Sequence, residues 1–173
     1  MNNLSKNLFC EKSVLGNEAS VETFMLVRML KALGYKDSQI RTKEQIDTLV
    51  VNEGRRRANY MPDYVMTYRG KPRWVLDAKS CSEDIDHWIG QCQSYCMIMN
   101  SKQKDNPVKC FMLSNGLRAK VYKWDNEEPI LELSFEDFSD SSPKWRELQR
   151  LLSPGSAFLN DTGTDSTPPP RGI

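Results

Sequence analysis

The sequence predicts a mixed α/β (α+β) domain, in which amphipathic helices alternate with antiparallel hairpins. In residues 17–33 and 83–99, apolar side chains recur at spacings of three and four, which indicates helices. Residues 64–79 and 108–124 are rich in β-forming side chains on either side of a turn signal. The 173 residues are 39% hydrophobic, which is enough to build one core, so we expect one domain of ordinary size.

The first predicted helix runs from Asn17 to Leu33. Asn17 is a favoured N-cap residue, acidic side chains follow in the first turns, and Gly34 comes directly after the last periodic residue. We therefore expect a helix of about four to five turns.

The next segment, residues 35–61, carries weaker signals. It contains a polar stretch and then three consecutive arginines, Arg55, Arg56 and Arg57. We expect a loop at the arginines and one short strand elsewhere in the segment.

Two hairpins and a second helix follow along the chain. Residues 64–79 form the first hairpin, because Gly70 and Pro72 suit a turn between "YVMTY" and "RWVLDAK". Asn115-Gly116 predicts a tight turn in the second hairpin, since these residues tolerate positive φ angles. The helix of residues 83–99 separates the two hairpins.

The C-terminal part adds a strand at 130–135 and a short helix at 142–152. After Leu152 the composition changes to Ser, Thr, Gly and Pro with few large apolar side chains. We therefore divide the chain into an N-terminal segment (1–16), a folded domain (17–152) and a disordered tail or linker (153–173).

Composition excludes several classes of protein. A net charge of +1 does not indicate a broadly basic surface, so any nucleic-acid site must be local. The five cysteines include no Cys-x-x-Cys pair, which favours a reducing, cytoplasmic location. No signal peptide or membrane-length apolar run is present, and no Gly-rich phosphate loop of an ATP-driven motor.

Three charged residues mark the first hairpin as a candidate site. Asp77 and Lys79 are two apart on a strand, so their side chains point to the same side of the sheet. Antiparallel pairing around Gly70 brings Asp63 beside Asp77. Carboxylate oxygens suit Mg²⁺ or Mn²⁺, and a nearby lysine can orient or help deprotonate an attacking water. The alternative is a surface hairpin with one ion pair.

The first helix adds acidic residues to this picture. At about 100° per residue, Glu22 falls on the apolar face near Met25, where a carboxylate is costly to bury without compensation. Glu18 lies one turn earlier on nearly the same face, and its alternative role is a favourable interaction with the helix dipole. Either glutamate can be the acid of the site.

Other polar residues are weaker candidates. Gln91 and Tyr95 are four apart on one helix face and can reach a scissile phosphate, although a helix-edge Gln and a half-buried Tyr are common without function. A basic group near the hairpin is expected to contact nucleic-acid phosphates beside the acidic centre, or else to be solvated: Arg55, Arg56, Arg57, Arg69, Lys71 and Arg73.

A zinc site is not expected. Cys92 and Cys96 lie on the apolar stripe of their helix, which favours buried free thiols. His87, the single histidine, is expected to be exposed, and a fourth ligand is not evident.

The order of Glu22, Pro62-Asp63, Asp77-Ala78-Lys79 and Gln91-x-x-x-Tyr95 resembles the PD-(D/E)XK nuclease superfamily. Within it, residues 17–125 most resemble the N-terminal nuclease domain of type I restriction enzyme R subunits. The resemblance implies a restriction-endonuclease-like core, with a mixed central β-sheet flanked by helices, and Mg²⁺-dependent cutting of nucleic acid, DNA first, in restriction or anti-phage defence. A helicase-like motor usually follows this domain in the family, whereas here a Pro-rich tail follows.

The resemblance also implies roles for individual residues. Asp63, Asp77 and the Ala78 carbonyl would bind the metal, with Glu22 completing the acidic cluster. Lys79 would position or activate the attacking water, and Gln91 and Tyr95 would stabilise the site. Homodimers or a motor or specificity subunit are the expected protein partners. The alternative is a non-cutting module that binds nucleic acid or joins a larger defence complex.

Overall fold

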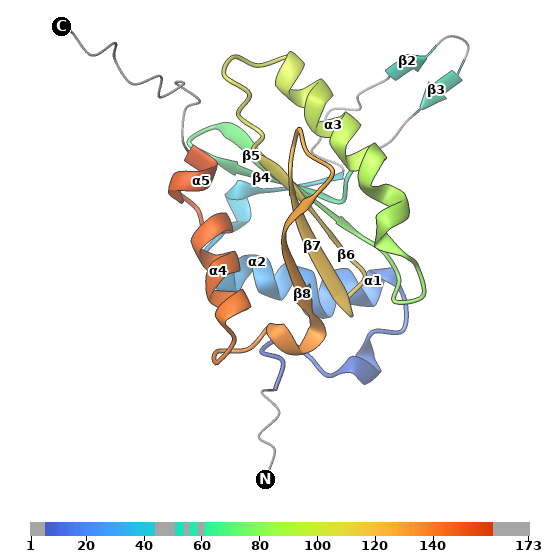
Figure 1. Cartoon of the computed structure of the whole chain (residues 1–173), viewed down its shortest axis with the longest axis vertical. Coiled ribbons are helices and arrows are strands. Elements are labelled where there is room, and N and C mark those ends of the chain that lie inside the picture. The colour runs from blue at the N-terminus through green and yellow to red at the C-terminus, as the bar shows by residue number, and fades with distance from the viewer. Residues whose placement is uncertain (1–5, 44–50, 54–55, 59–60, 161–173) are drawn as a thin grey trace, which may run out of the picture.

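The fold is of the α+β class and is built around a mixed six-stranded sheet (Figure 1). The computed structural model describes residues 6–43, 51–53, 56–58 and 61–160, with only the backbone described at 51–53 and 56–58. The strand order in the sheet is β1-β4-β5-β6-β7-β8. This architecture is compatible with the restriction-endonuclease-like core expected from the sequence.

Only one neighbouring pair of strands in this sheet, β5 and β6, runs parallel. Parallel neighbours need a crossover connection, and a helix, α3 (Ile89–Ser101), supplies it here. The strands of the sheet are β1 (Ile40–Thr42), β4 (Tyr64–Tyr68), β5 (Lys71–Ala78), β6 (Cys110–Ser114), β7 (Arg118–Lys123) and β8 (Pro129–Ser134).

The segment 35–61 contains more strand than the sequence predicts. Besides β1 at the sheet edge, β2 (Val51–Glu53) and β3 (Arg56–Ala58) form a separate antiparallel pair. Arg56 and Arg57 therefore belong to a strand rather than to the expected loop, and Arg55 lies outside the described residues. Such short strands depend on their pairing partners, which the local sequence does not reveal.

The first helix has the predicted ends but an irregular centre. Asn17 accepts a hydrogen bond from the Ser20 backbone N–H, and Gly34 ends the helix with a φ of 104°. Between these caps lie α1 (Glu18–Ser20), a π-helical turn (Val21–Leu26) and α2 (Val27–Leu33). The Val27 N–H bonds to the Glu22 carbonyl, five residues back, so Glu22 lies within a distortion often associated with functional sites.

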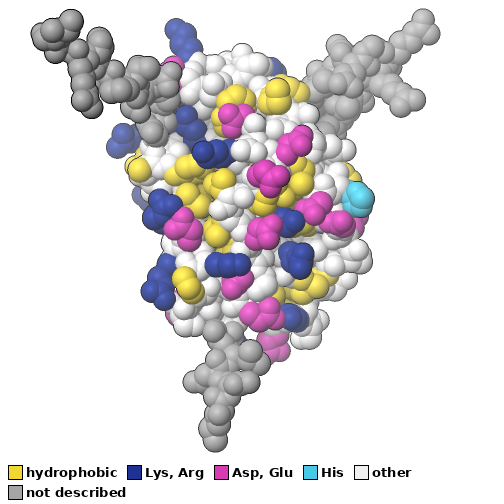
Figure 2. All heavy atoms as spheres, viewed as in Figure 1, with side chains coloured by type: hydrophobic (Ala, Val, Ile, Leu, Met, Phe, Trp, Pro, Cys, Tyr) yellow, Lys and Arg dark blue, Asp and Glu magenta, His cyan; other side chains and the backbone are white. Residues whose placement is uncertain are grey.

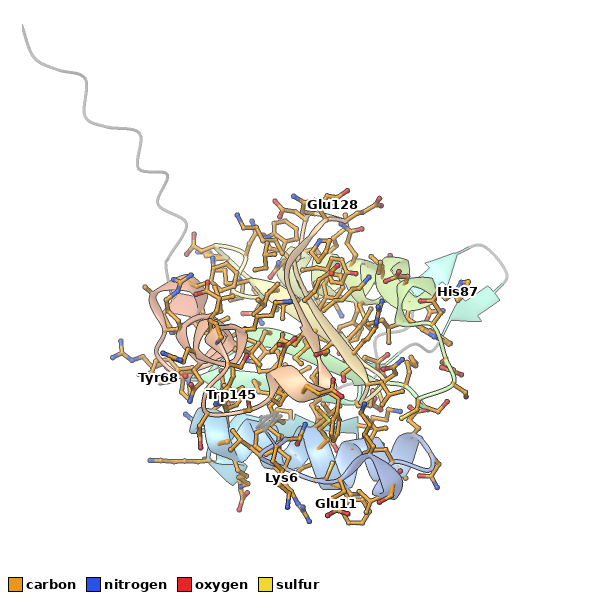
Figure 3. The ribbon with its side chains drawn as sticks, turned by 60° about the horizontal axis from the view of Figure 1, so that its bottom comes forward. Lys6, Glu11, Tyr68, His87, Glu128 and Trp145 are labelled. Atoms are coloured by element: carbon orange, nitrogen blue, oxygen red, sulfur yellow. The ribbon has the colours of Figure 1, made fainter. Side chains whose placement is uncertain are left out.

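Two apolar clusters hold helices on opposite faces of the sheet. On one face, α3 (Ile89–Ser101) and the 3₁₀ turn before it (Ile85–Trp88) pack against Val75 and Phe111. On the other, α2 and α4 (Pro143–Leu152) pack against Trp74 and Leu76. Figure 3 shows Trp145 of α4 beside the helices of this second face. Alternate side chains of β5 serve the two faces, because strand side chains alternate.

The two hairpin turns use different devices. Arg69 and Gly70 have φ angles of 51° and 75°, as in the tight type I′ turns that join antiparallel strands. At Asn115-Gly116 only the glycine has a positive φ, 87°, and Asn115 acts through its side chain, which accepts from the N–H groups of Leu117 and Arg118. The predicted hairpin is present, but its turn is longer than the tight turn that was expected.

The folded part extends beyond the boundary predicted at Leu152. The helix α5 (Ala157–Asn160) packs on the body, with Leu159 only 1% exposed and its carbonyl 3.4 Å from Nη1 of Arg73. A composition rich in Ser, Gly and Pro suggested disorder, yet one buried leucine and two hydrogen bonds of the Ser156 hydroxyl fix residues 153–160. This hydroxyl donates to the Leu151 carbonyl and accepts from the Leu159 N–H. Residues 161–173 of the predicted tail lie outside the described residues.

Lys and Arg side chains alternate with Asp and Glu over the face shown in Figure 2. This mixture agrees with the near-zero net charge of the sequence. Among the described helices, none has the length and apolar character needed to cross a membrane.

We predict that Leu159→Ala destabilises the domain by about 2–4 kcal/mol, because it empties a buried leucine site. The same substitution at Leu8, which is 41% exposed, is expected to cost less than about 1 kcal/mol. Urea unfolding of the two variants measures the difference. Equal stability of the two would show that α5 is not part of the folded unit.

Candidate active site

The candidate site forms where β4 begins and β5 ends. The Asp63 carboxylate accepts a hydrogen bond at Oδ2 from the Ala78 backbone N–H, at 2.7 Å. In return, the Asp63 backbone N–H lies 3.3 Å from Oδ1 of Asp77. Both aspartates are at most 3% exposed, so the predicted juxtaposition of the two is present and buried.

Lys79 extends into the same site from the end of β5. Its Nζ lies 3.2 Å from Oδ2 of Asp77, as expected for residues two apart on a strand. The same ammonium lies 3.6 Å from the ring centroid of Trp88, which precedes α3. A cation over an indole face is a favourable contact, so Lys79 is held from two sides. Its side chain is accordingly only 10% exposed.

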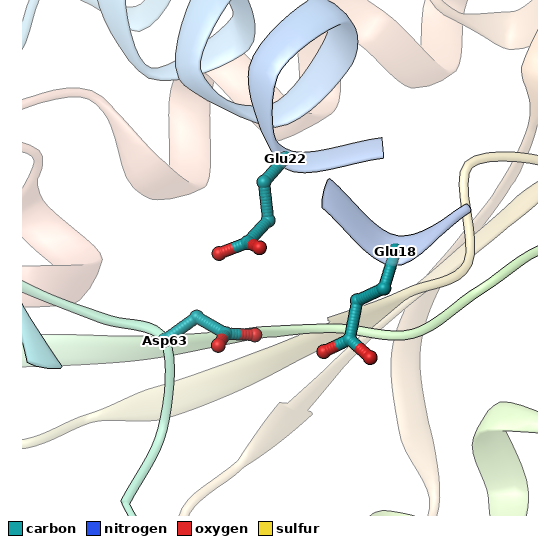
Figure 4. A group of neighbouring side chains, drawn as sticks. All are labelled: Glu18, Glu22 and Asp63. Atoms are coloured by element: carbon teal, nitrogen blue, oxygen red, sulfur yellow. The ribbon is translucent and has the colours of Figure 1, made fainter. Parts of the chain in front are cut away.

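Two glutamates reach the site from the first helix, which lies on the face of the sheet opposite to α3. Glu18 and Glu22 each bring a carboxylate oxygen within 4.8 Å of an Asp63 oxygen and of each other. Figure 4 shows the three carboxylates pointing toward one another. Both glutamates are thus placed at the site, and neither is confined to a helix-dipole role.

The pKa shifts of the glutamates reflect this crowding. Burial raises the pKa of Glu22 above its usual range, and the Asp63 charge raises it further, while a hydrogen bond from Tyr64 opposes the shift. Burial and then Asp63 raise the pKa of Glu18 in the same way. Burial also raises the pKa of the Tyr64 hydroxyl, with a further contribution from Glu22. Negative charge at this end of the sheet is therefore costly.

Lys43, just after β1, is a site residue that the sequence interpretation missed. Its Nζ lies 2.8 Å from Oδ1 of Asp63, and its side chain is 53% exposed. The hydrogen bond to Asp63 raises the pKa of Lys43, and the charges of Asp77 and Glu22 add to this, while burial opposes it. No sequence signal marked it, because β1 reaches the site only through its pairing with β4.

The donor set fits a hard divalent cation. Carboxylate oxygens are the ligands that Mg²⁺ and Mn²⁺ prefer, and Glu18, Glu22 and Asp63 supply converging ones. Asp77 lies next to this cluster, where its carboxylate contacts the Asp63 backbone N–H and the Lys79 ammonium. The Ala78 backbone adjoins the Asp63 carboxylate, and its carbonyl stays a predicted ligand.

Gln91 and Tyr95 occupy different environments on α3. Tyr95 is 3% exposed and belongs to the apolar cluster with Val75 and Phe111. Gln91 lies on the exposed side of the same helix. A role for either in stabilising the site stays a prediction.

The basic residues of the hairpin lie away from the acidic centre. Arg69 and Lys71 are at the turn, and β5 carries the chain about 23 Å from there to Ala78. Arg73 is 7% exposed and packed against the α5 carbonyl of Leu159. The expected proximity to the acidic centre is therefore wrong for these three, since residues close in sequence are separated along an extended strand.

His87 is exposed, as predicted. That side chain is 79% exposed at the surface, as its position in Figure 3 shows. Cys92 and Cys96 are buried in the α3 cluster and form no disulfide, as predicted.

Comparisons with known proteins add little to this geometry. No protein-family model matches the chain, and no curated protein matches it. Among solved structures, the chain is similar to one from the cryo-EM structure of the DrdV–DNA complex. The similarity covers 84% of this chain and 83% of that chain, with a TM-score of 0.47 and 14% sequence identity.

We predict that Glu22→Gln stabilises the metal-free protein at neutral pH. The ionised form of a carboxyl group with a raised pKa is disfavoured in the folded state, so stability is greatest below the ordinary pKa and falls as pH rises through the raised one. The gain is expected to stay below about 1 kcal/mol, because solvent screens this half-buried group.

Urea unfolding in EDTA at pH 7 and at pH 4 measures the effect, which should shrink at the lower pH. Glu147→Gln is the control with the opposite sign, since a hydrogen bond from Arg150 lowers the pKa of Glu147. A loss of stability at neutral pH in Glu22→Gln would contradict the raised pKa of Glu22 and its cost to the folded state.

Proposed function

We propose that this chain is a metal-dependent endonuclease that hydrolyses phosphodiester bonds in nucleic acid, DNA first, in a restriction or anti-phage defence setting. The observation that carries the proposal is the meeting of Asp63, Asp77 and Lys79 with two glutamates at one end of the sheet. The sequence resemblance to PD-(D/E)XK nucleases supports DNA as the substrate and defence as the setting.

The chemistry of the site supports hydrolysis of a charged ester. Glu18, Glu22 and Asp63 would hold Mg²⁺ or Mn²⁺, with Asp77 beside them. When bound, such a cation supplies positive charge to the scissile phosphate and lowers the pKa of water. Burial of the aspartates keeps their oxygens fixed, which favours a preorganised site.

Lys79 would act on the attacking water and on the phosphate. Asp77 and the Trp88 ring hold its ammonium in place, and Asp77 adjoins the carboxylate cluster through the Asp63 backbone. From there it would orient the attacking water and stabilise negative charge that develops on the phosphate oxygens. The water oxygen would bond to phosphorus and give up one proton, the ester P–O bond would break, and the departing oxygen would take up one proton.

The second candidate is a module that keeps this fold and binds nucleic acid without cutting it, or serves a larger complex. The ion pairs Lys43–Asp63 and Lys79–Asp77 favour it, because they neutralise both aspartates with the chain's own lysines. With the two lysines in place, the aspartates need no divalent cation to offset their charge.

We predict that plasmid, linear duplex, single-stranded DNA or RNA is cut in Mg²⁺ or Mn²⁺ and is left intact in EDTA. Asp77→Asn and Lys79→Met are each expected to lower the cleavage rate at least about 100-fold, the usual range for groups acting in the transition state. Gel assays under single-turnover conditions measure the rates.

Lys144→Gln serves as the control, because it removes the same charge from an exposed ion pair with Asp137. Parent-like cutting by both site variants would refute the nuclease assignment. Absence of cutting by the parent, with salt-sensitive binding retained, would favour the non-cutting module.

A further inference from the structure

We propose that Lys43 is a built-in counter-cation of the site, which competes with the divalent cation for Asp63 and is released when that cation binds. This inference rests on the proposed function, because it concerns the same carboxylates. It assigns a role to a lysine outside the sequence pattern of the candidate nuclease.

The two oxygens of Asp63 are used differently. Oδ2 accepts the Ala78 backbone N–H at 2.7 Å, a contact that holds the carboxylate in the sheet. Oδ1 receives the Lys43 ammonium at 2.8 Å. A cation that binds Asp63 at Oδ1 therefore meets the ammonium first and has to displace it.

The pair is fixed on one side and movable on the other. The Asp63 side chain is 2% exposed, whereas that of Lys43 is 53% exposed. A lysine side chain with this exposure can leave its partner and regain water, since its charge is well hydrated. Lys79 differs, because it is 10% exposed and lies between Asp77 and Trp88. Lys79 is thus held in place beside Asp77, whereas Lys43 can leave Asp63 when a divalent cation binds there.

Charge explains why a divalent cation would win this exchange. The site holds four carboxylates, those of Asp63, Asp77, Glu18 and Glu22, and two ammonium groups, those of Lys43 and Lys79. Negative charge is therefore in excess even with both lysines in place. A divalent cation among those oxygens supplies more charge and repels the ammonium. The released ammonium stays tethered beside the site, where a substrate phosphate would need a positive partner.

Titration of the nucleic-acid-free protein with Mn²⁺ tests the competition, with calorimetry as the readout. Lys43→Gln is expected to bind Mn²⁺ roughly three- to tenfold more tightly than the parent, because it removes a competing and repelling charge. Lys43→Arg keeps the charge and should bind as the parent does. Lys144→Gln is the matched control, since that lysine is 51% exposed and also pairs with an aspartate, and it should not change the affinity.

Amine acetylation followed by mass spectrometry tests the release in the parent protein. Mn²⁺ is expected to raise the labelling of Lys43 several-fold while leaving that of Lys144 unchanged. Equal or weaker Mn²⁺ binding by Lys43→Gln, or unchanged labelling of Lys43, would overturn the inference and leave the nuclease proposal standing. Absence of Mn²⁺ binding by every variant would overturn both.

Discussion

The site depends on two hydrogen bonds that join the start of β4 to the end of β5. In one, the Asp63 carboxylate accepts the Ala78 N–H, and in the other, the Asp77 carboxylate accepts the Asp63 N–H. Each aspartate thus continues the pairing of the strands where the regular ladder stops. Because backbone groups hold them, the two carboxylates are buried with satisfied partners, and groups from both faces of the sheet can meet around them.

Much of this site follows from periodicity in the sequence. The period of two in a strand places Asp77 and Lys79 together, and a hairpin around Gly70 places Asp63 opposite them. Helical spacing likewise puts Glu18 and Glu22 on one side of the first helix, which the structure turns toward Asp63. These are local rules, and the predicted helices, hairpins and α+β class rest on the same rules.

Features that depend on distant contacts escaped prediction. Lys43 joins the site because β1 pairs with β4, and no local pattern encodes that pairing. Arg69 and Lys71 were expected near the carboxylates, but β5 separates them from the site. The stretch after Leu152 has the composition of a linker, yet burial of Leu159 holds it to the body. In each case tertiary packing outweighs composition and sequence proximity.

The π-helical turn divides the first helix into two parts with separate tasks. Met29 and Leu33 of α2 are anchored in the core, whereas Glu18 and Glu22 face the sheet end. One added residue in a helix rotates one part against the other by about 100°. The turn therefore sets the direction of the acids relative to α2, while Val21 and Met25 of the same turn pack in the core. An insertion or deletion at this turn would therefore redirect the acids and at the same time shift Val21, Met25 and Leu26 in the hydrophobic interior, so the chemistry of the site and the packing of the core are inherited together.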